Sequence, residues 1–353
     1  MKSMTNNEQL VSNCARLYSD YGYRRFMMNK FESYSLYADN KSFLVDDRLL
    51  TFTDGGQLKA LKPDITLSIV KNLAKQNHFP LKVYYDEAVY RVKKGDREFS
   101  ELRQMGLELI GDNSLYATAE VVCLAKASLD IIHQDSILDI SHMGILLPLI
   151  DNACCAGIDR QEIMELISQK NADGLETVLV KFGCPDTLAK LVKAYAPISD
   201  MILELNALFP DSEPVRQISQ IAEILRAMNL DKNVYLDFSL MHDFSYYNGI
   251  IFKGYVRNVP VAVLSGGRYD PLLERFDLDT AAVGFAIYLD YIQYRDESSD
   301  DDILLLYSQD DQACAVARAM QLLISQGFCA LAATQPPANR SFTKTITVKE
   351  VLS

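Results

Sequence analysis

Residues 81–111 contain charged side chains that could bind a small polar molecule. Glu108 lies within an otherwise apolar stretch, which follows an alternating stretch that ends at Arg91. Arginine offers a planar fork of donors to an anion, whereas a glutamate attracts a cationic group. The segment between the two stretches, residues 92–104, could cover an anion with its basic residues Lys93, Lys94, Arg97 and Arg103.

Two antiparallel strands joined by a long loop at residues 92–104 would position these groups. Alternation along the first strand predicts one shared face, formed by Val83, Tyr85, Glu87, Val89 and Arg91. The return strand has an apolar face with Met105, Leu107 and Leu109. Because a buried, unpaired carboxylate is costly, we expect Glu108 to project from the opposite face into a cleft. A solvated hairpin tip of mixed charge explains the same pattern, and the hairpin alone leaves both interpretations open.

Two further polar residues, Asp64 and Thr66, precede a segment with helical periodicity. The buried face of that helix would be Leu67, Val70, Leu73 and Ala74. A side-chain oxygen at the start of a helix accepts a free N–H group of the first turn, so either residue can be a cap. The same oxygens could hold a ligand, and both roles stay open.

Helical periodicity and breaks outline the rest of the chain. Helices are expected at residues 7–21, at 113–133 and, in several pieces broken near Pro185, Pro197 and Pro210, at 143–232. A strand at residues 48–53 would lead into a turn at Asp54-Gly55-Gly56, and residues 303–331 fit a strand, a helix and a strand.

Two glycine-containing turns are predicted after the helical region at 143–232. Asn248-Gly249 would join two strands, directly after Tyr246 and Tyr247. Gly266-Gly267 would lead from a strand into a helix, and a turn of that kind can bind phosphate.

Composition limits the class of protein. The 353 residues carry a net charge of −12, which argues against nonspecific nucleic-acid binding. The start of the chain lacks the apolar core of a signal peptide, and no apolar run approaches the ~20 residues of a membrane span. The seven cysteines have no metal-ligand spacing, so we expect reduced, mostly packing residues in a cytoplasmic protein. His133 and His142 have no evident ligand set around them, and no metal site is expected.

The hairpin with Arg91, Gln104 and Glu108 resembles motif 2 of class II aminoacyl-tRNA synthetases, and in particular the histidyl-tRNA synthetase family. Three further stretches match that family in order: LLTFTDGGQLKALKPDIT, FSYYNGIIFKGYV and LSGGRYDPLLERF with AAVGFAIYLD. The resemblance implies an α+β fold, a class II synthetase-like antiparallel sheet flanked by helices. It implies a synthetase-like domain at 1–295, with a helical insertion at about 143–232. Residues 296–353 would be a short α/β remnant of an anticodon-binding domain.

The resemblance also implies a pocket for histidine. Carried over to this chain, the histidine-binding positions are Asp64, Thr66, Arg91, Gln104, Glu108, Tyr246 and Tyr247. The family's Arg-Pro-Glu is here Lys62-Pro63-Asp64, which keeps the charges. The stretch GYRRFMMNKFESYSLY resembles motif 1 of the class II dimer interface and implies a homodimer, although Asn29 replaces its proline.

The positions that handle ATP in the family differ here. The motif 2 pattern Arg-x-Glu is Arg91-Val92-Lys93, which reverses a charge. In motif 3, Tyr288 replaces a glycine and Tyr291 replaces the arginine that grips the γ-phosphate. His242 replaces a further arginine of the family, and Ser245 replaces an aspartate. Since losing one positioned cation commonly costs about 10²–10³ in rate, we expect no adenylation and no catalytic residue.

A retained pocket without ATP chemistry resembles the non-catalytic members of the family, the regulatory subunits of ATP phosphoribosyltransferase. The resemblance implies a chain that binds and activates a short-form catalytic subunit in the first step of L-histidine biosynthesis. It also implies histidine feedback, a homodimer within a hetero-oligomer, and no cofactor. Two alternatives stay open: a histidine- or RNA-sensing module without this partner, and an active histidyl-tRNA synthetase.

Overall fold

The computed structural model describes residues 6–44, 48–73, 80–92, 98–240, 246–292, 302–337 and 342–353. The chain divides into two compact units, residues 13–292 and residues 1–12 together with 293–353. Several residues singled out above lie outside the described ranges: Ala74, Lys93, Lys94, Arg97, His242 and Ser245.

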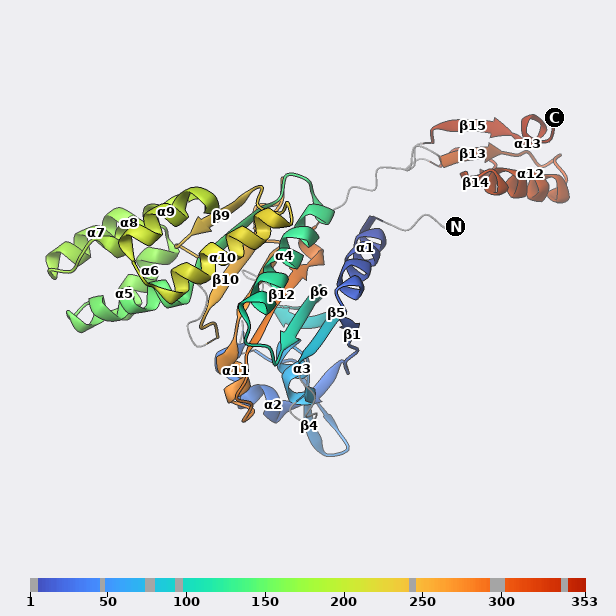
Figure 1. Ribbon diagram of the computed structural model, residues 1–353. Coiled ribbons are helices and arrows are strands. Elements are labelled where there is room, and N and C mark those ends of the chain that lie inside the picture. The colour runs from blue at the N-terminus through green and yellow to red at the C-terminus, as the bar shows by residue number, and fades with distance from the viewer. Residues whose placement is uncertain are drawn as a thin grey trace. The chain divides into compact units, whose positions relative to one another are not determined.

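The large unit is built on a nine-stranded mixed sheet in the order β1-β5-β6-β12-β11-β10-β7-β9-β8 (Figure 1). Its strands are β1 (Arg24–Arg25), β5 (Leu81–Val92), β6 (Phe99–Ile110), β7 (Ile137–His142), β8 (Tyr195–Pro197), β9 (Val234–Asp237), β10 (Ile250–Tyr255), β11 (Leu264–Arg268) and β12 (Ala282–Tyr288). Neighbouring strands are antiparallel except β1 with β5 and β7 with β9. The predicted α+β class is confirmed.

Helices α4 (Leu115–Ile132) and α10 (Glu213–Ala227) cover one face of this sheet, together with the part of α1 (Asn6–Asp20) that follows residue 12. The buried Tyr18 of α1 packs its ring against Tyr84 and Phe285 of the sheet, and its hydroxyl is 2.8 Å from Ser128 of α4. Gly254 of β10 lets Leu129 of α4 approach the strand, because a Cβ there would lie 2.6 Å from that side chain.

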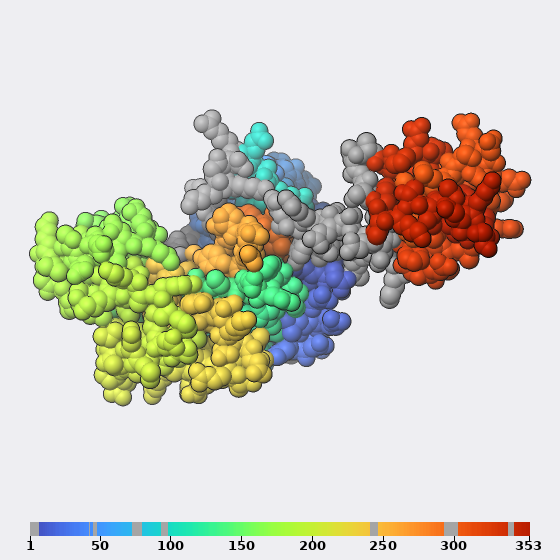
Figure 2. Space-filling view, turned by 90° about the horizontal axis from the view of Figure 1, so that it is seen from above, coloured from blue at the N-terminus to red at the C-terminus, as the bar shows by residue number. Residues whose placement is uncertain are grey.

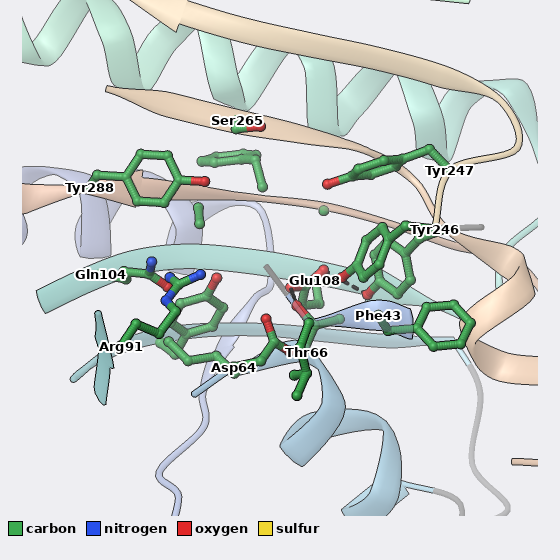
Figure 3. Close-up of a pocket in the computed structure, with 17 residues that line it drawn as sticks. Phe43, Asp64, Thr66, Arg91, Gln104, Glu108, Tyr246, Tyr247, Ser265 and Tyr288 are labelled. Carbon is green, nitrogen blue, oxygen red and sulfur yellow. Dashed lines mark hydrogen bonds between the residues drawn. The ribbon is translucent and has the colours of Figure 1, made fainter. Parts of the chain in front are cut away.

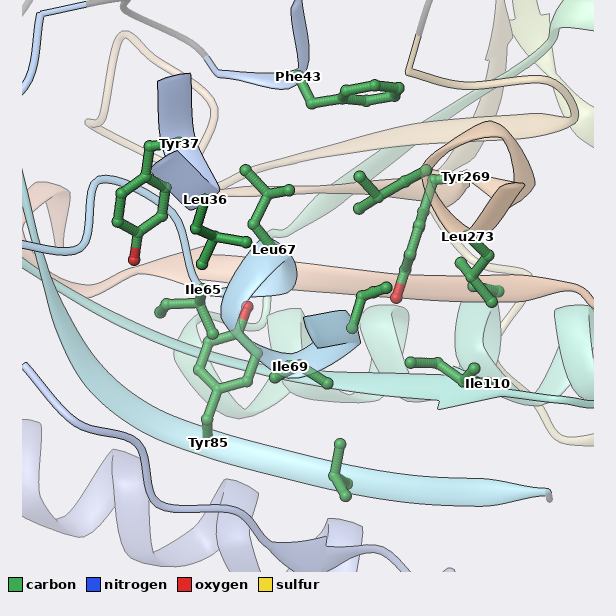
Figure 4. Packing of buried hydrophobic residues seen from close by; sticks show 14 of the residues in the cluster. Leu36, Tyr37, Phe43, Ile65, Leu67, Ile69, Tyr85, Ile110, Tyr269 and Leu273 are labelled. Atoms are coloured by element: carbon green, nitrogen blue, oxygen red, sulfur yellow. The ribbon is translucent and has the colours of Figure 1, made fainter. Parts of the chain in front are cut away.

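Shorter elements cover the opposite face around the β5–β6 hairpin. They are α2 (Tyr34–Ala38), a 3₁₀ turn η1 (Lys41–Phe43), α3 (Thr66–Leu73), α11 (Asp270–Glu274) and a small antiparallel sheet of β2 (Phe31–Ser33), β4 (Gln57–Leu61) and β3 (Thr51–Asp54). Their apolar side chains meet in one buried cluster that includes Tyr37, Ile65, Leu67, Ile69 and Tyr85 (Figure 4). Each such side chain contributes roughly 1.5–3 kcal/mol of burial free energy. The cluster therefore fixes α3 against the hairpin.

The segment that the resemblance interprets as a helical insertion forms one lobe of the large unit, drawn in light green to yellow in Figure 2. It consists of α5 (Met143–Cys155), α6 (Arg160–Ser168), α7 (Ala172–Lys181), α8 (Thr187–Lys193), α9 (Ile198–Leu208) and then α10. The loop predicted at Pro197 is wrong, because Pro197 ends β8, which pairs with β9 at the edge of the sheet. Proline is tolerated there because an edge strand is paired on one side only.

The small unit contains β13 (Asp302–Leu306), α12 (Ala313–Ser325), β14 (Cys329–Ala333), β15 (Lys344–Thr347) and α13 (Val348–Leu352). The three strands are parallel, in the order β14-β13-β15. The strand, helix and strand expected at 303–331 are present. Kinship of this unit with an anticodon-binding domain stays a prediction.

The loop of the central hairpin is shorter than predicted. Strand β5 extends to Val92 and β6 begins at Phe99, so Arg103 lies within a strand. The Nε and Nη2 atoms of Arg103 donate to the carboxylate of Asp86 at 2.8 and 2.7 Å. Arg103 is therefore an ion-pair partner across the hairpin, and its assignment to an anion-covering loop is wrong.

Both predicted glycine turns are also wrong. Gly266 and Gly267 lie inside β11, where a Cβ would be 2.4 Å from the carbonyl oxygen of Gly284 and 2.6 Å from that of Ile250, respectively. Glycine is needed there for close strand packing, so these residues form no phosphate-binding turn. Asn248-Gly249 does not join paired strands, because β7 lies between β9 and β10.

Most of the cysteines lie outside the buried interior. All seven cysteines are free, but only Cys14 and Cys123 are buried. The expectation that most of them pack in the interior is therefore wrong. Within the described ranges, no helix combines the length and apolarity that crossing a bilayer requires.

Candidate functional site

One cavity of about 150 Å³ opens on the sheet face opposite α4 (Figure 3). All seven residues predicted as a binding pocket line it: Asp64, Thr66, Arg91, Gln104, Glu108, Tyr246 and Tyr247. They come from α3 and the turn before it, from both strands of the hairpin, and from the segment before β10. An engineered apolar cavity of ~150 Å³ holds one benzene-sized molecule, so this space suits a small ligand with a single ring.

The closed end of the cavity is formed around Glu108, whose exposed fraction is 2%. Thr66 Oγ1 donates to Glu108 Oε1 at 3.0 Å, and Tyr269 Oη donates to Oε2 at 2.6 Å. Strand β12 makes room for the carboxylate with Gly284, because a Cβ at that position would lie 1.7 Å from Oε2. The carboxylate is thus held in one orientation by two hydroxyl groups.

Burial dominates the electrostatics of this end. It raises the pKa of Glu108 to about 8, although the hydrogen bonds from Tyr269 and Thr66 oppose the shift. Burial also raises the pKa of Asp64, and hydrogen bonds from the backbone and the charge of Arg91 oppose it. Among the described residues neither carboxylate forms a salt bridge. Two acids without a paired cation favour a ligand that brings positive charge or N–H donors.

The structure separates the roles of Asp64 and Thr66. Asp64 Oδ1 accepts the N–H of Leu67 at 2.9 Å, so Asp64 caps α3 while it also lines the cavity. The hydroxyl of Thr66 is bound to Glu108. Asp64 is therefore the capping residue, and the binding roles of both residues stay predictions.

Arg91, Gln104 and Tyr288 form the other end of the cavity (Figure 3). Gln104 of β6 and Tyr288 of β12 are direct cross-strand partners. The Nε atom of Arg91 is buried and has no hydrogen-bond partner among the residues that the structure describes. Because a buried donor without a partner is costly, this end favours an anionic or carbonyl oxygen from a ligand.

Aromatic side chains close the cavity beside Glu108. Tyr246 packs 4.6 Å from Tyr247, 5.8 Å from Tyr269 and 5.9 Å from Phe43, measured between ring centroids. Our sequence interpretation missed ten lining residues, among them Phe43, Tyr85, Ser265, Tyr269 and Tyr288. Tyr269 lies within the matched string GGRYD, and Tyr288 is a departure from a matched motif, so both carried a signal.

An acid end, a cationic end and a wall of rings suit a small zwitterion with one ring. A model of the histidyl-tRNA synthetase family matches residues 2–292. The chain belongs to the histidyl-tRNA synthetase family. Relatives of at least 30% identity place it among the ATP phosphoribosyltransferase regulatory subunits of that family.

Two groups of curated relatives resemble the chain. The ATP phosphoribosyltransferase regulatory subunit of Desulfitobacterium hafniense is 31% identical over 76% of this chain and 73% of the relative. The ATP phosphoribosyltransferase regulatory subunit of Caldanaerobacter subterraneus is 29% identical over 78% of this chain and 75% of the relative. The histidine–tRNA ligase of Methanocaldococcus jannaschii is 29% identical over 84% and 74%.

Solved structures confirm the class II synthetase-like fold. An ATP phosphoribosyltransferase regulatory subunit/histidyl-tRNA synthetase from Bacillus halodurans superposes with a TM-score of 0.75, over 97% of this chain and 93% of that one, at 23% identity. The histidyl-tRNA synthetase of Nostoc gives a TM-score of 0.70, over 94% and 83%, at 16% identity. At these identities the likeness concerns the fold.

His133 and His142 both form hydrogen bonds within the protein. His142 is buried and caps α5, since its Nδ1 accepts the N–H of Gly144 at 3.0 Å, and its Nε2 is 3.1 Å from Gln217 Oε1. Burial lowers the pKa of His142 to about 4. His133 Nδ1 accepts the N–H of Asp135 at 3.0 Å. No cluster of metal-ligating side chains occurs in the portion of the chain with assigned positions.

Proposed function

We propose that this chain is a non-catalytic, cytoplasmic regulatory subunit that activates a short-form ATP phosphoribosyltransferase. That reaction is the first step of L-histidine biosynthesis, and the chain would take part in its feedback by histidine. It would act as a homodimer within a hetero-oligomer with the catalytic subunit. The name of the relatives supports this proposal. The observation that carries it is a cavity with amino-acid-binding chemistry that has one cationic side chain among its described lining residues, Arg91.

Free histidine fits this cavity best. Its imidazole N–H would donate to Glu108, whose two oxygens face the closed end. Its ammonium group would lie near Asp64 and Gln104, and its carboxylate would accept from the buried Nε of Arg91. The Nε atom of Arg91 would thereby gain the hydrogen-bond partner that it lacks among the described residues.

The same cavity is poorly equipped for ATP. A triphosphate needs several positioned cations to stabilise the transferring group. Two altered motif 3 positions hold Tyr288 and Tyr291, whose ring centroids lie 5.7 Å apart. Neither ring can supply a positive charge.

Reconstitution tests the proposal. The chain is mixed with the short ATP phosphoribosyltransferase of the same organism, and phosphoribosyl-ATP formation is followed with and without histidine. Activity that appears only in the mixture and falls with added histidine is expected. Absence of both activation and co-elution would contradict the proposed function.

An active synthetase is the second candidate, favoured by the likeness to the ligase of Methanocaldococcus jannaschii. Histidine-dependent exchange of pyrophosphate into ATP distinguishes the two. We expect no exchange from the purified chain, and exchange at the rate of an ordinary synthetase would favour this second function.

A further inference from the structure

The size of the side chains along β12 sets the length of the cavity. The residues of this strand that share the cavity face are Ala282, Gly284, Ala286 and Tyr288. Small side chains form the floor as far as Ala286, and the strand then places a full ring at Tyr288. The floor therefore ends beside Gln104, the cross-strand partner of Tyr288.

A neighbouring ring supports the ring of Tyr288. It packs against Tyr291, with ring centroids 5.7 Å apart at 51°. In Figure 3 the Tyr288 ring projects over Arg91 and Gln104, with its hydroxyl directed along the cavity toward Tyr247. A ring packed in this way is a wall that a ligand must displace in order to pass.

Tyr288 lines the end of the cavity where the carboxylate of the ligand would lie. Arg91, Ala286 and Tyr288 are half-buried at this end, whereas Gln104 is buried. A ligand whose ring contacts Glu108 and whose carboxylate contacts Arg91 would thus direct its carboxylate toward Tyr288. Any group attached to that carboxylate would have to pass the ring of Tyr288.

We propose that Tyr288 restricts this cavity to ligands with a free carboxylate and excludes acyl adenylates and other carboxyl-linked derivatives. The inference rests on the proposed binding of histidine. The ring of Tyr288 acts by occupying space, and Arg91 acts by pairing with the free carboxylate. The chain therefore discriminates between an amino acid and its activated form.

Calorimetric titration of two ligands tests the inference. L-histidine and the stable adenylate analogue histidyl-sulfamoyl-adenosine are titrated into the wild-type chain and into Tyr288→Gly, Tyr288→Ala and Tyr288→Phe. We expect the wild type to bind the analogue at least tenfold more weakly than histidine. Tyr288→Gly and Tyr288→Ala should each raise the ratio of analogue affinity to histidine affinity at least tenfold above that of the wild type. Tyr288→Phe should behave as the wild type, because the ring and not the hydroxyl fills the space.

Each result has one meaning. Wild-type binding of the analogue as tight as that of histidine overturns the inference, even if no variant folds. The same conclusion follows if the glycine and alanine variants bind histidine but their ratio of analogue affinity to histidine affinity stays at the wild-type value. Failure of the wild-type chain to bind histidine at all contradicts the proposed function itself, and this inference with it.

Discussion

The hydroxyl of Tyr269 donates a 2.6 Å hydrogen bond to Oε2 of Glu108, across 161 residues of sequence. Thr66 occupies the other oxygen of the same carboxylate. Three distant segments, the start of α3, strand β6 and the residue after β11, therefore meet at one acid. This contact orients Glu108 before any ligand arrives.

Loss of the Tyr269 hydroxyl should weaken histidine binding. An intramolecular hydrogen bond contributes roughly 0.5–1.5 kcal/mol, so we expect Tyr269→Phe to reduce affinity by about two- to tenfold. Calorimetry measures the effect. Tyr116→Phe is the control, because Tyr116 is 61% exposed and lies outside the cavity. Equal affinity in Tyr269→Phe and the wild type would show that the hydroxyl does not orient Glu108 for binding.

Two substitutions of Asp64 should separate capping from binding. Asparagine caps a helix about as well as aspartate, so Asp64→Asn should keep the free energy of unfolding within about 0.5 kcal/mol and lose affinity for histidine. Asp64→Ala should lose affinity and also about 0.5–2 kcal/mol of stability. Urea denaturation and calorimetry on both variants check this. Unchanged histidine affinity in Asp64→Asn would limit the role of Asp64 to capping.

Stability should fall with rising pH because of Glu108. Burial raises its pKa from 4.5 to about 8, so between these values the folded protein holds a proton that the unfolded chain has released. The free energy of unfolding then decreases as pH rises, by at most about 1.4 kcal/mol per pH unit.

Glu108→Gln cannot titrate and should show a smaller decrease over the same window. Asp139, with a pKa raised to about 6, and His142, with one lowered to about 4, contribute equally to both proteins and cancel in the comparison. Urea denaturation across this pH range measures the difference. Parallel pH profiles for the two proteins would contradict the shifted pKa of Glu108.

Gly284→Ala should disrupt the closed end of the cavity. The added Cβ would lie 1.7 Å from Glu108 Oε2, so the carboxylate must move away from Tyr269 and Thr66. We expect a loss of about 1–3 kcal/mol of stability and of most histidine affinity. Gly254→Ala is the control, since its Cβ meets Leu129 on the other face of the sheet. It should lower stability without changing affinity, and a matching loss of affinity would show that binding only follows stability.

Local patterns in the sequence predicted the parts of the site that depend on one segment. Alternation along the hairpin placed Arg91 on the face of Tyr85, and the helix-start pattern placed Asp64 at a cap. The motif resemblance predicted that residues as distant as Thr66 and Tyr247 belong together, and one cavity contains them.

The two predictions of glycine turns failed because strand pairing between distant segments decides the structure there. Gly266 and Gly267 look like a turn, but they lie inside a strand packed closely between two neighbours. Asn248-Gly249 looks like a hairpin turn, but β7 separates the two strands in space. Local sequence propensity does not determine which distant strand pairs with a given strand in the sheet. Tyr269 was missed for the same reason, because its contact with Glu108 exists only after the sheet has formed.

The most direct test of this account is the titration of L-histidine into the wild-type chain, Glu108→Ala and Glu101→Ala. Glu108 is buried at the closed end of the cavity, whereas Glu101 is an exposed residue of the same strand. We predict that the wild type and Glu101→Ala bind histidine alike, and that Glu108→Ala binds it at least tenfold more weakly. An unchanged affinity in Glu108→Ala would contradict the assignment of this cavity to histidine.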